Sequence, residues 1–365
     1  MDRKELCVNA ADATDLAGWT PIDLQWRPEG TRVDWCRLGD TRFTEPFFEQ
    51  TIATALRDPA RLLFRRQTPV AALEALQNDP SALPPRGFIF HLSRCGSTLA
   101  AQLLAALPQN LVLSEAPPID QLLNAQRYDS TLTRERRLAQ IRGLVHALGR
   151  PRHRDERHLF IKFDSWHMLE LPLILEAFPD VPWIFLYREP VEIMVSQHRQ
   201  RGTQMIPGIV NPWLFGFDPA AVTPMSPDEY CARVLARISV AAAMHARLGR
   251  GRLVNFTELP AVMWESLGEF FGLEWTQDDL ARMQRGSLAD AKNPSLAHAD
   301  DRAAKQREAG EEIHRLTEAL LCEPYEQLET IRLAQADGAE SASALAASAS
   351  SSRLNQSFTT QSITK

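Results

Sequence analysis

The clearest structural signal in the chain is the stretch FIFHLSRCGSTLAAQLL, from Phe88 to Leu104. It begins with a continuous apolar run, which is typical of a strand buried in a parallel sheet. A polar turn with one glycine follows, and apolar residues then recur at helical spacing. Backbone N–H groups at the start of such a helix are unpaired and carry the positive end of its dipole. The stretch therefore predicts a site for an anion.

Four further apolar runs downstream have the character of buried strands, and helical patterns separate them. Strands that alternate with helices imply right-handed crossovers and a mostly parallel sheet. The predicted fold class is α/β, a doubly wound and mostly parallel sheet of the nucleotide-binding type, with an N-terminal extension and a C-terminal helical region. Binding sites in such sheets lie at the carboxyl ends of the strands. The four further strands are expected at 110–115, 158–163, 182–189 and 251–256.

The chain divides by pattern into four segments. Residues 1–85 are interpreted as an extension packed on the core, with two short strands around 28–30 and a helix that starts near Glu45 and Pro46. The core is expected at 86–260 and further helices at 261–333. Residues 334–365 are rich in alanine and serine and poor in large apolar residues, so we expect a disordered tail.

The composition excludes several classes of protein. With 365 residues and 44% hydrophobic content, the chain can bury a substantial core. It contains no apolar run long enough to span a membrane, and its N-terminus is charged where a signal peptide is apolar, so we expect a cytoplasmic protein. The five cysteines are scattered, which argues against a disulfide framework and a zinc site. The net charge of -6 gives no reason to expect a nucleic-acid partner.

Within the turn after the first core strand, each residue type suits an anion. Gly96 permits close approach of the backbone, Ser97 and Thr98 offer hydroxyl donors, and Arg94 adds a cation. An ordinary strand-to-helix turn with Ser97 as N-cap is the alternative. The turn lacks the lysine and the second glycine of the G-x-x-x-x-G-K-[ST] motif that binds nucleoside triphosphates.

A second segment, FLYREPVEIMVS from Phe185 to Ser196, adds a further candidate anion site. Arg188 stands at a strand end, and Ser196 follows about two helical turns later. Both side chains could reach one further phosphate. Taken alone, Arg188 suits a surface ion pair and Ser196 an ordinary helix position.

Together, the two segments resemble the sulfotransferase family, in its bacterial and tyrosylprotein-type branch, whose donor is 3′-phosphoadenosine 5′-phosphosulfate (PAPS). The resemblance covers about 86–259. It implies that the turn Arg94–Thr98 holds the 5′-phosphosulfate and that Arg188 and Ser196 hold the 3′-phosphate. A serine is commoner at Cys95, and because a thiol is a weak donor, we expect backbone N–H groups to bind the anion there.

The resemblance also implies three catalytic candidates. Lys162, at the end of a predicted strand, matches a family lysine near the leaving oxygen, although a strand-end lysine that extends to solvent is the alternative. Glu115 stands where tyrosylprotein-type enzymes have their catalytic glutamate, and Asp164 where cytosolic relatives have a histidine. Either carboxylate could be the base, and Glu115 is modestly favoured; either could also be a capping or ion-pairing group.

Two basic residues near the C-terminus, Lys292 and Arg302, could close over the nucleotide as the family's basic loop does. A solvated, charged helix start is the alternative. We expect no metal, and a structural or rim role for His91, His167 and His198, because none has a ligand partner at helical spacing.

The predicted function is transfer of a sulfuryl group from PAPS to a hydroxyl or amine of a small-molecule or peptide acceptor. The alternatives are an ATP-dependent phosphotransferase, against which the missing lysine counts, and a noncatalytic nucleotide-binding scaffold. The acceptor and the oligomeric state do not follow from the sequence. Aromatic residues near Trp26 to Phe48 and Trp213 to Phe217 suit an acceptor pocket or, more commonly, a core.

Overall fold

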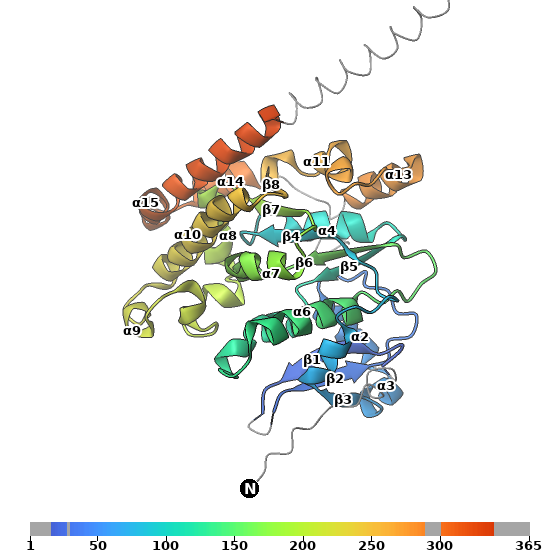
Figure 1. The fold of residues 1–365 in the computed structure, drawn as a ribbon. Helices are drawn as coiled ribbons and strands as arrows, with labels where there is room; N and C mark the ends of the chain where they lie inside the picture. The colour runs from blue at the N-terminus through green and yellow to red at the C-terminus, as the bar shows by residue number, and fades with distance from the viewer. Residues whose placement is uncertain (1–15, 28–29, 289–300, 339–365) are drawn as a thin grey trace, which may run out of the picture.

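The computed structural model describes residues 16–27, 30–288 and 301–338. These residues form two sheets, a three-stranded antiparallel sheet in the order β1-β2-β3 and a five-stranded parallel sheet in the order β5-β6-β4-β7-β8 (Figure 1). The prediction of an α/β fold with a parallel sheet is confirmed. The strands are β1 Thr20–Gln25, β2 Arg32–Cys36, β3 Arg66–Pro69, β4 Pro85–His91, β5 Asn110–Ser114, β6 His158–Lys162, β7 Trp183–Tyr187 and β8 Gly251–Asn255.

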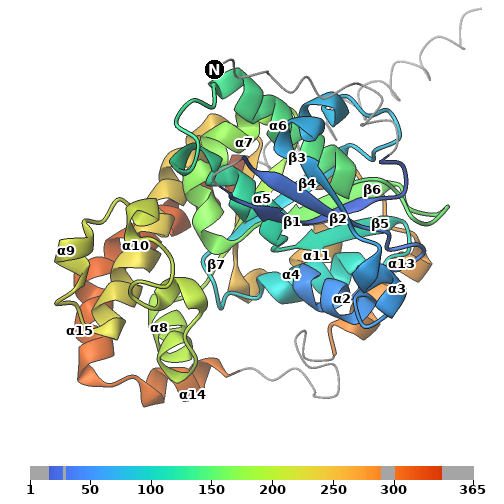
Figure 2. The same cartoon turned by 90° about the horizontal axis from the view of Figure 1, so that it is seen from below.

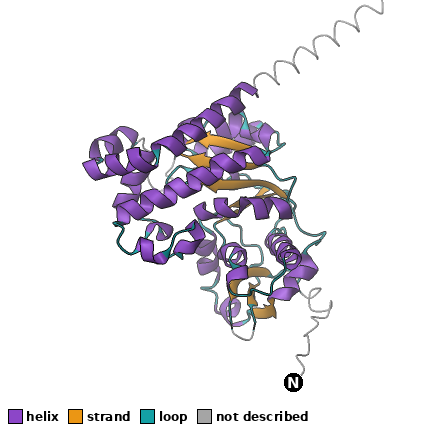
Figure 3. Ribbon diagram, turned by 60° about the vertical axis from the view of Figure 1, so that its left-hand side comes forward, coloured by secondary structure: helices purple, strands orange, loops and turns teal. Residues whose placement is uncertain are grey.

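Helices cover both faces of the parallel sheet because its strands are apolar on both faces (Figure 3). Phe88 and Phe90 belong to one buried cluster, which α5, α6, α7 and α10 share. Ile89, between them, belongs to a second cluster with α4, α11, α12 and α13. The α-helices are α2 Phe48–Ala55, α3 Pro59–Leu63, α4 Ser97–Ala105, α5 Pro117–Leu123, α6 Arg134–Leu148, α7 Leu171–Ala177, α8 Pro190–Arg199, α9 Pro219–Val222, α10 Pro227–His245, α11 Val262–Glu265, α12 Leu267–Phe270, α13 Gln277–Gly286, α14 Arg302–Glu308 and α15 Glu311–Leu320.

The strand order places a topological switch point at β4. After β4 the chain crosses to β5 and β6 on one side, and it then returns to add β7 and β8 on the other. A crevice forms at the carboxyl ends of the strands where crossovers leave in opposite directions. The turn after β4 therefore lies at the position where an open α/β sheet binds its ligand.

The N-terminal extension forms its own small sheet, which packs on α5 and α6 through β1. The sequence predicted β1 and β2 but not β3, whose four residues are too short to give a pattern. The predicted helix begins at Phe48, not near Glu45, and Phe47 precedes it in an extended conformation. This small sheet places Phe47 beside the parallel sheet's carboxyl edge, where it lines a cavity.

The C-terminal part is helical for longer than the sequence indicated. A helix occupies 322–338, so the expected tail cannot begin at 334, and 339–365 lie outside the described residues. Gln335 explains the difference, because its side chain accepts a hydrogen bond from Leu253 N (2.9 Å) and donates one to Gly251 O (2.9 Å). Among the described helices, none is long and apolar enough to cross a membrane.

Candidate active site

A cavity of about 650 Å³ opens at the carboxyl edge of the parallel sheet. The turn after β4, the residue that follows β5, the segment after β6, the residue that follows β7 and the later part of α8 all contribute to its wall. The predicted residues Arg94 to Thr98, Glu115, Asp164, Arg188 and Ser196 all line it. Parallel strands bring these residues together because their carboxyl ends share one edge of the sheet.

The turn between β4 and α4 curls tightly through positive φ angles. Ser93 has a φ of 68°, Arg94 of 52° and Gly96 of 82°. A Cβ atom at Gly96 would lie 2.6 Å from Leu259 Cδ1 and 2.9 Å from Phe256 Cδ2, so glycine is required by both conformation and space. Turns of this kind direct successive N–H groups toward a common centre and bind anions.

Helix α4 begins directly after this turn, with Gly96 at its N-cap. The N–H groups of its first turn, from Ser97 onward, have no acceptor within the helix. The Cys95 thiol instead points inward and donates to Leu186 O at 3.1 Å, and burial raises its pKa to about 11. Backbone N–H groups and the hydroxyls of Ser97 and Thr98 thus offer the donors at this end of the cavity.

Arg188 is held rigidly at the opposite side of the turn. Its side chain is 6% exposed, its Nε is paired with Glu192, and its guanidinium lies 4.0 Å from the centre of the Phe256 ring. The Arg188 Nη2 faces the cavity and donates to Asp301 Oδ1 at 2.7 Å. Stacking and the buried ion pair fix the plane of the guanidinium, which prepares it to bind a phosphate.

Lys305 is a second buried cation at the same end, and sequence reasoning did not select it. Its side chain is 5% exposed, it lines the cavity, and its Nζ lies 2.7 Å from Asp301 Oδ2. Lys162 and Lys305 are the two lysines among the described residues, and both are buried. The signal for Lys305 in the sequence is the scarcity of lysine in a chain rich in arginine, because a lysine at such a position suggests that a compact ammonium is needed there. A buried ammonium is also costly unless it has a charged partner.

Lys162 and Glu115 form a charge pair at the other end of the cavity. The Lys162 ammonium contacts Glu115 Oε1 and lies 5.1 Å from the centre of the Phe47 ring. Lys162 is 1% exposed and is not among the lining residues, whereas Glu115 is. Burial alone would raise the pKa of Glu115, but Lys162 and His91 outweigh it and hold that pKa well below its ordinary range.

His91 stands behind Glu115 as a neutral ring. Its Nδ1 accepts a hydrogen bond from Ser93 N at 3.0 Å, which leaves the proton of the neutral ring on Nε2. That Nε2 lies 3.2 Å from Glu115 Oε1. Burial lowers the pKa of His91, which favours the neutral form. The ring therefore links the turn after β4 to Glu115, beyond the structural role expected of it.

Asp164 lines the cavity in a different electrical environment. Burial raises its pKa to about 7, and the nearby carboxylates Glu115 and Asp120 act in the same direction. Its Oδ2 lies 3.8 Å from His167 Nδ1, and its side chain is 14% exposed. Asp164 is therefore a carboxyl group that gains and loses a proton near neutral pH.

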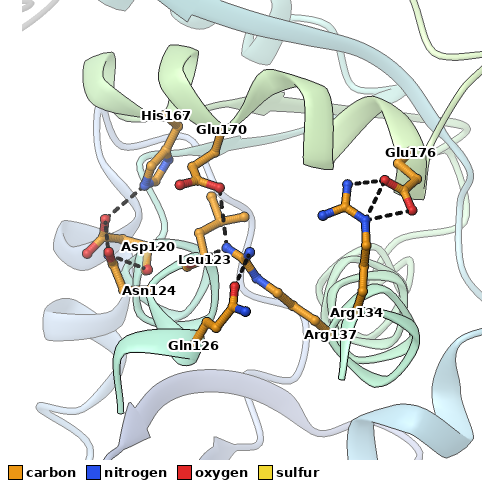
Figure 4. Close-up of polar contacts among 9 residues, drawn as sticks. All are labelled: Asp120, Leu123, Asn124, Gln126, Arg134, Arg137, His167, Glu170 and Glu176. Atoms are coloured by element: carbon orange, nitrogen blue, oxygen red, sulfur yellow. Dashed lines mark hydrogen bonds and ion pairs between the residues drawn. The ribbon is translucent and has the colours of Figure 1, made fainter. Parts of the chain in front are cut away.

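Asp120 completes the acidic end, and a hydrogen-bond network holds it in place (Figure 4). Its Oδ1 accepts from His167 Nε2 (2.8 Å), Trp166 Nε1 (2.7 Å) and Asn124 Nδ2 (3.2 Å). Nearby, Arg137 Nη2 on α6 donates to Leu123 O on α5 at 2.5 Å and lies 3.3 Å from Glu170, which joins these elements. These hydrogen bonds and this ion pair connect the side chains around Asp120 to one another and restrict their movement.

One group among the described residues has the composition of a metal site. Asp120, Asp164 and His167 bring one ligand-type atom each to within 4.8 Å of one another. The Asp120 Oδ1, however, already accepts three hydrogen bonds, and His167 uses its Nε2 as one of those donors. We therefore interpret this group as a hydrogen-bonded cluster.

Two predicted residues near the C-terminus are placed differently. Lys292 lies outside the described residues. Arg302 is exposed at the start of α14 and is not among the lining residues, whereas Lys305, one turn later on the same helix, is. Of the aromatic candidates, Phe47 lines the cavity, and Trp35 is fully buried in the core. Phe47 thus has the position that the sequence suggested for an aromatic pocket residue, and Trp35 has the core position that was the alternative.

No family model matches the chain, and no curated protein matches it. The chain is similar in structure to bacterial sulfotransferases, the family that the sequence resembles. The sulfotransferase domain from the curacin biosynthetic pathway is 18% identical with a TM-score of 0.40, over 66% of this chain and 98% of that domain. The sulfotransferase domain from the Synechococcus olefin synthase is 17% identical with a TM-score of 0.40, over 70% of this chain and 96% of that domain.

A third solved structure is the sulfotransferase STF9 from Mycobacterium avium. It is 13% identical to this chain with a TM-score of 0.40, and the match covers 74% of this chain and 80% of that one. Identities of this size concern the fold alone.

Proposed function

We propose that the chain is a sulfotransferase that moves a sulfuryl group from PAPS to a hydroxyl or amine of a small-molecule or peptide acceptor. One observation carries the proposal: the anion-binding turn Arg94–Thr98, the cation Arg188 and the titrating carboxyl Asp164 line one cavity. The first two suit a ligand with phosphate groups at two separate points. The third suits removal of a proton near neutral pH.

In the proposed complex, the turn and the first N–H groups of α4 hold the 5′-phosphosulfate, with Arg94 as the adjacent cation. Arg188, Ser196 and Lys305 hold the 3′-phosphate. No metal takes part in this proposal, because the turn supplies its positive potential through N–H groups and side chains.

Asp164 is the base that we now favour, in place of Glu115. A general base is most effective when its pKa lies near the working pH, and burial raises the pKa of Asp164 to about 7. The pKa of Glu115 lies well below its ordinary range, since Lys162 and His91 stabilise its charge. Glu115 and Lys162 then act as a positioning pair, because the Lys162 ammonium already contacts Glu115.

The proposed step is an in-line displacement at sulfur. The acceptor oxygen or nitrogen forms a bond to sulfur as its proton passes to Asp164. The bond between sulfur and the bridging oxygen breaks, and its electron pair stays on the 5′-phosphate of the product, 3′-phosphoadenosine 5′-phosphate (PAP). N–H groups at the start of α4 stabilise the charge that develops there.

Three finer points belong to the same proposal: a cytoplasmic location, an absence of nucleic-acid partners and the division of the chain at 85/86, 260/261 and 333/334. The last boundary moves to 338/339 in our proposal, because 334–338 are helical.

The test is a thermal unfolding experiment with PAP and with ATP. A ligand that binds the folded form alone stabilises it by about 2.7 kcal/mol at a concentration of one hundred times its dissociation constant. We expect PAP to raise the thermal midpoint and ATP to leave it nearly unchanged. A rise with ATP and none with PAP would favour the phosphotransferase. Binding of PAP without PAP release from PAPS, across a panel of phenols and amines, would favour the noncatalytic alternative.

A further inference from the structure

Asp301 bridges the two buried cations at the phosphate end of the cavity. Its Oδ1 accepts a hydrogen bond from Arg188 Nη2 at 2.7 Å, and its Oδ2 lies 2.7 Å from Lys305 Nζ. The cations are nearly inaccessible, but Asp301 is 41% exposed. One carboxylate thus engages both cations through separate oxygens, as two oxygens of a phosphate would.

Two further contacts of Arg188 restrict the directions from which a ligand can reach its guanidinium. Glu192 takes the Nε, and Phe256 covers one face of the guanidinium. Ser196, which lines the same cavity, lies on α8 about two helical turns after Arg188, which precedes that helix. A phosphate that binds Arg188 Nη2 and Lys305 Nζ together therefore competes with the carboxylate of Asp301.

The position of Asp301 would allow its carboxylate to move away from the two cations without displacing α14. It stands at the N-cap of α14, yet its side chain makes no capping hydrogen bond. Other contacts hold α14 in place, namely the ion pair of Arg199 with Glu308 and the hydrogen bond from Gln306 Nε2 to Glu189 Oε2 at 2.7 Å. Figure 2 shows α14 beside α8, at the side of the molecule where α10 and α15 also lie.

We propose that Asp301 is an internal counter-ion at the position of the donor's 3′-phosphate, and that donor binding exchanges its carboxylate for that phosphate. This inference rests on the proposed function. A phosphate monoester carries a charge of about -1.5 to -2 and three acceptor oxygens, so it outcompetes one carboxylate. A donor that lacks the group leaves Asp301 in place. Asp301 therefore keeps two buried cations paired between turnovers and lowers the affinity for nucleotides with a 3′-phosphate, which must displace it.

The test measures dissociation constants by calorimetry for the wild type and Asp301→Asn. The substitution keeps the shape and removes the competing charge. We expect PAP to bind the variant on the order of tenfold more tightly. Adenosine 5′-phosphosulfate, which has no 3′-phosphate, should bind both proteins equally. The control is Asp180→Asn, which removes the same charge from an exposed ion pair with Arg250 at the amino end of β7.

The outcomes separate the two proposals. Equal or weaker PAP binding by Asp301→Asn, with a PAP-binding wild type, overturns the exchange and leaves the proposed function standing. A wild type that binds no PAP overturns both. Tighter binding of both nucleotides shows a general charge effect and also overturns the exchange. Asp301→Ser is the second variant, and it controls for new contacts that the amide of Asn could form. We expect it to bind PAP more tightly than the wild type does and to bind adenosine 5′-phosphosulfate equally.

Discussion

The two ends of the cavity differ in the kind of charged groups that they contain. At the phosphate end, Arg188 and Lys305 are buried and share one carboxylate. At the other end, Glu115 and Asp164 are carboxyl groups that follow the adjacent strands β5 and β6, and their pKa values are displaced in opposite directions. The phosphate end thus contains cations whose charge is fixed near neutral pH. The other end contains a carboxyl group that can take up and release a proton in that range.

The physical cause of the difference lies in the partners. Glu115 contacts the ammonium of Lys162, so its charged form is stabilised in spite of burial. Asp164 is buried beside other carboxylates and has His167 as its nearest cationic partner, at 3.8 Å. Two carboxyl groups whose pKa values are separated in this way can take different roles in one reaction.

The largest expected effect separates these two carboxyl groups. Asp164→Asn cannot accept a proton, so turnover should fall by roughly 10²–10⁴-fold, while PAP affinity should stay nearly the same. Glu115→Gln should reduce turnover less, because it removes a positioning contact. Turnover and PAP affinity of both variants are the measurements. A larger loss in Glu115→Gln than in Asp164→Asn would reverse our assignment of the base.

The second effect is on donor binding. Arg188→Ala should weaken PAP binding by roughly 2–4 kcal/mol, the loss of a charge-assisted and buried phosphate contact. Adenosine 5′-phosphosulfate should be nearly unaffected. Calorimetric titration of both nucleotides checks this. The matched control is Arg199→Ala, which removes an exposed arginine of the same helix that is paired with Glu308. Equal losses for both nucleotides would mean that Arg188 does not bind a 3′-phosphate.

The third effect is the pH dependence of turnover. The base acts in its charged form, and burial raises the pKa of Asp164 to about 7. Turnover at saturating substrate should therefore be about tenfold lower at pH 6 than on the plateau above pH 8. A rate profile between pH 5 and 9 measures it. A profile that is flat down to pH 5 would assign the proton transfer to a group with a lower pKa, such as Glu115.

The fourth effect is on stability. The pKa of Asp164 is about 7 in the folded chain, compared with about 3.9 in an unfolded one, so the folded state binds the proton more tightly. The wild type therefore loses stability as the pH rises from about 4 to 7. The Asp164→Asn variant does not show this loss, because its amide has no proton that titrates in this range. The thermal midpoint of Asp164→Asn should equal that of the wild type near pH 4 and exceed it by several degrees at pH 8. A difference that is independent of pH would contradict the burial of a titrating Asp164.

The smallest effect concerns the helix that braces the phosphate end. Gln335 hydrogen-bonds β8, and Asn255 at the end of β8 donates to Glu329 Oε1 at 2.8 Å, directly before Phe256, which stacks on Arg188. Truncation after 338 should leave the thermal midpoint nearly unchanged. Truncation after Arg332 should lower it by a few degrees, since it removes the contacts of Gln335. Equal midpoints for both truncations would show that this brace contributes nothing.

The core strands and the turn between β4 and α4 could be predicted from the sequence because their signals are local. Phe88 to Leu104 contains an apolar run, a glycine and a helical pattern within one short stretch. The carboxyl edge was also predicted as the common location of Arg94, Glu115, Asp164 and Arg188, since each of them follows a strand of one parallel sheet. Elements with little local pattern, such as the four residues of β3, were missed.

The roles within the site depended on contacts between residues far apart in the chain. Glu115 and Lys162 are separated by 47 positions, and Arg188 and Asp301 by 113. A pKa is set by burial and by the nearest charges, and no local pattern records either quantity. The sequence alone therefore determined the fold class, the turn between β4 and α4 and the edge of the sheet at which the candidate site residues meet. The tertiary structure decided which carboxyl group titrates near neutral pH, that Lys305 and Phe47 reach the cavity, and that Asp301 lies between the two cations, because each of these depends on packing across the sheet.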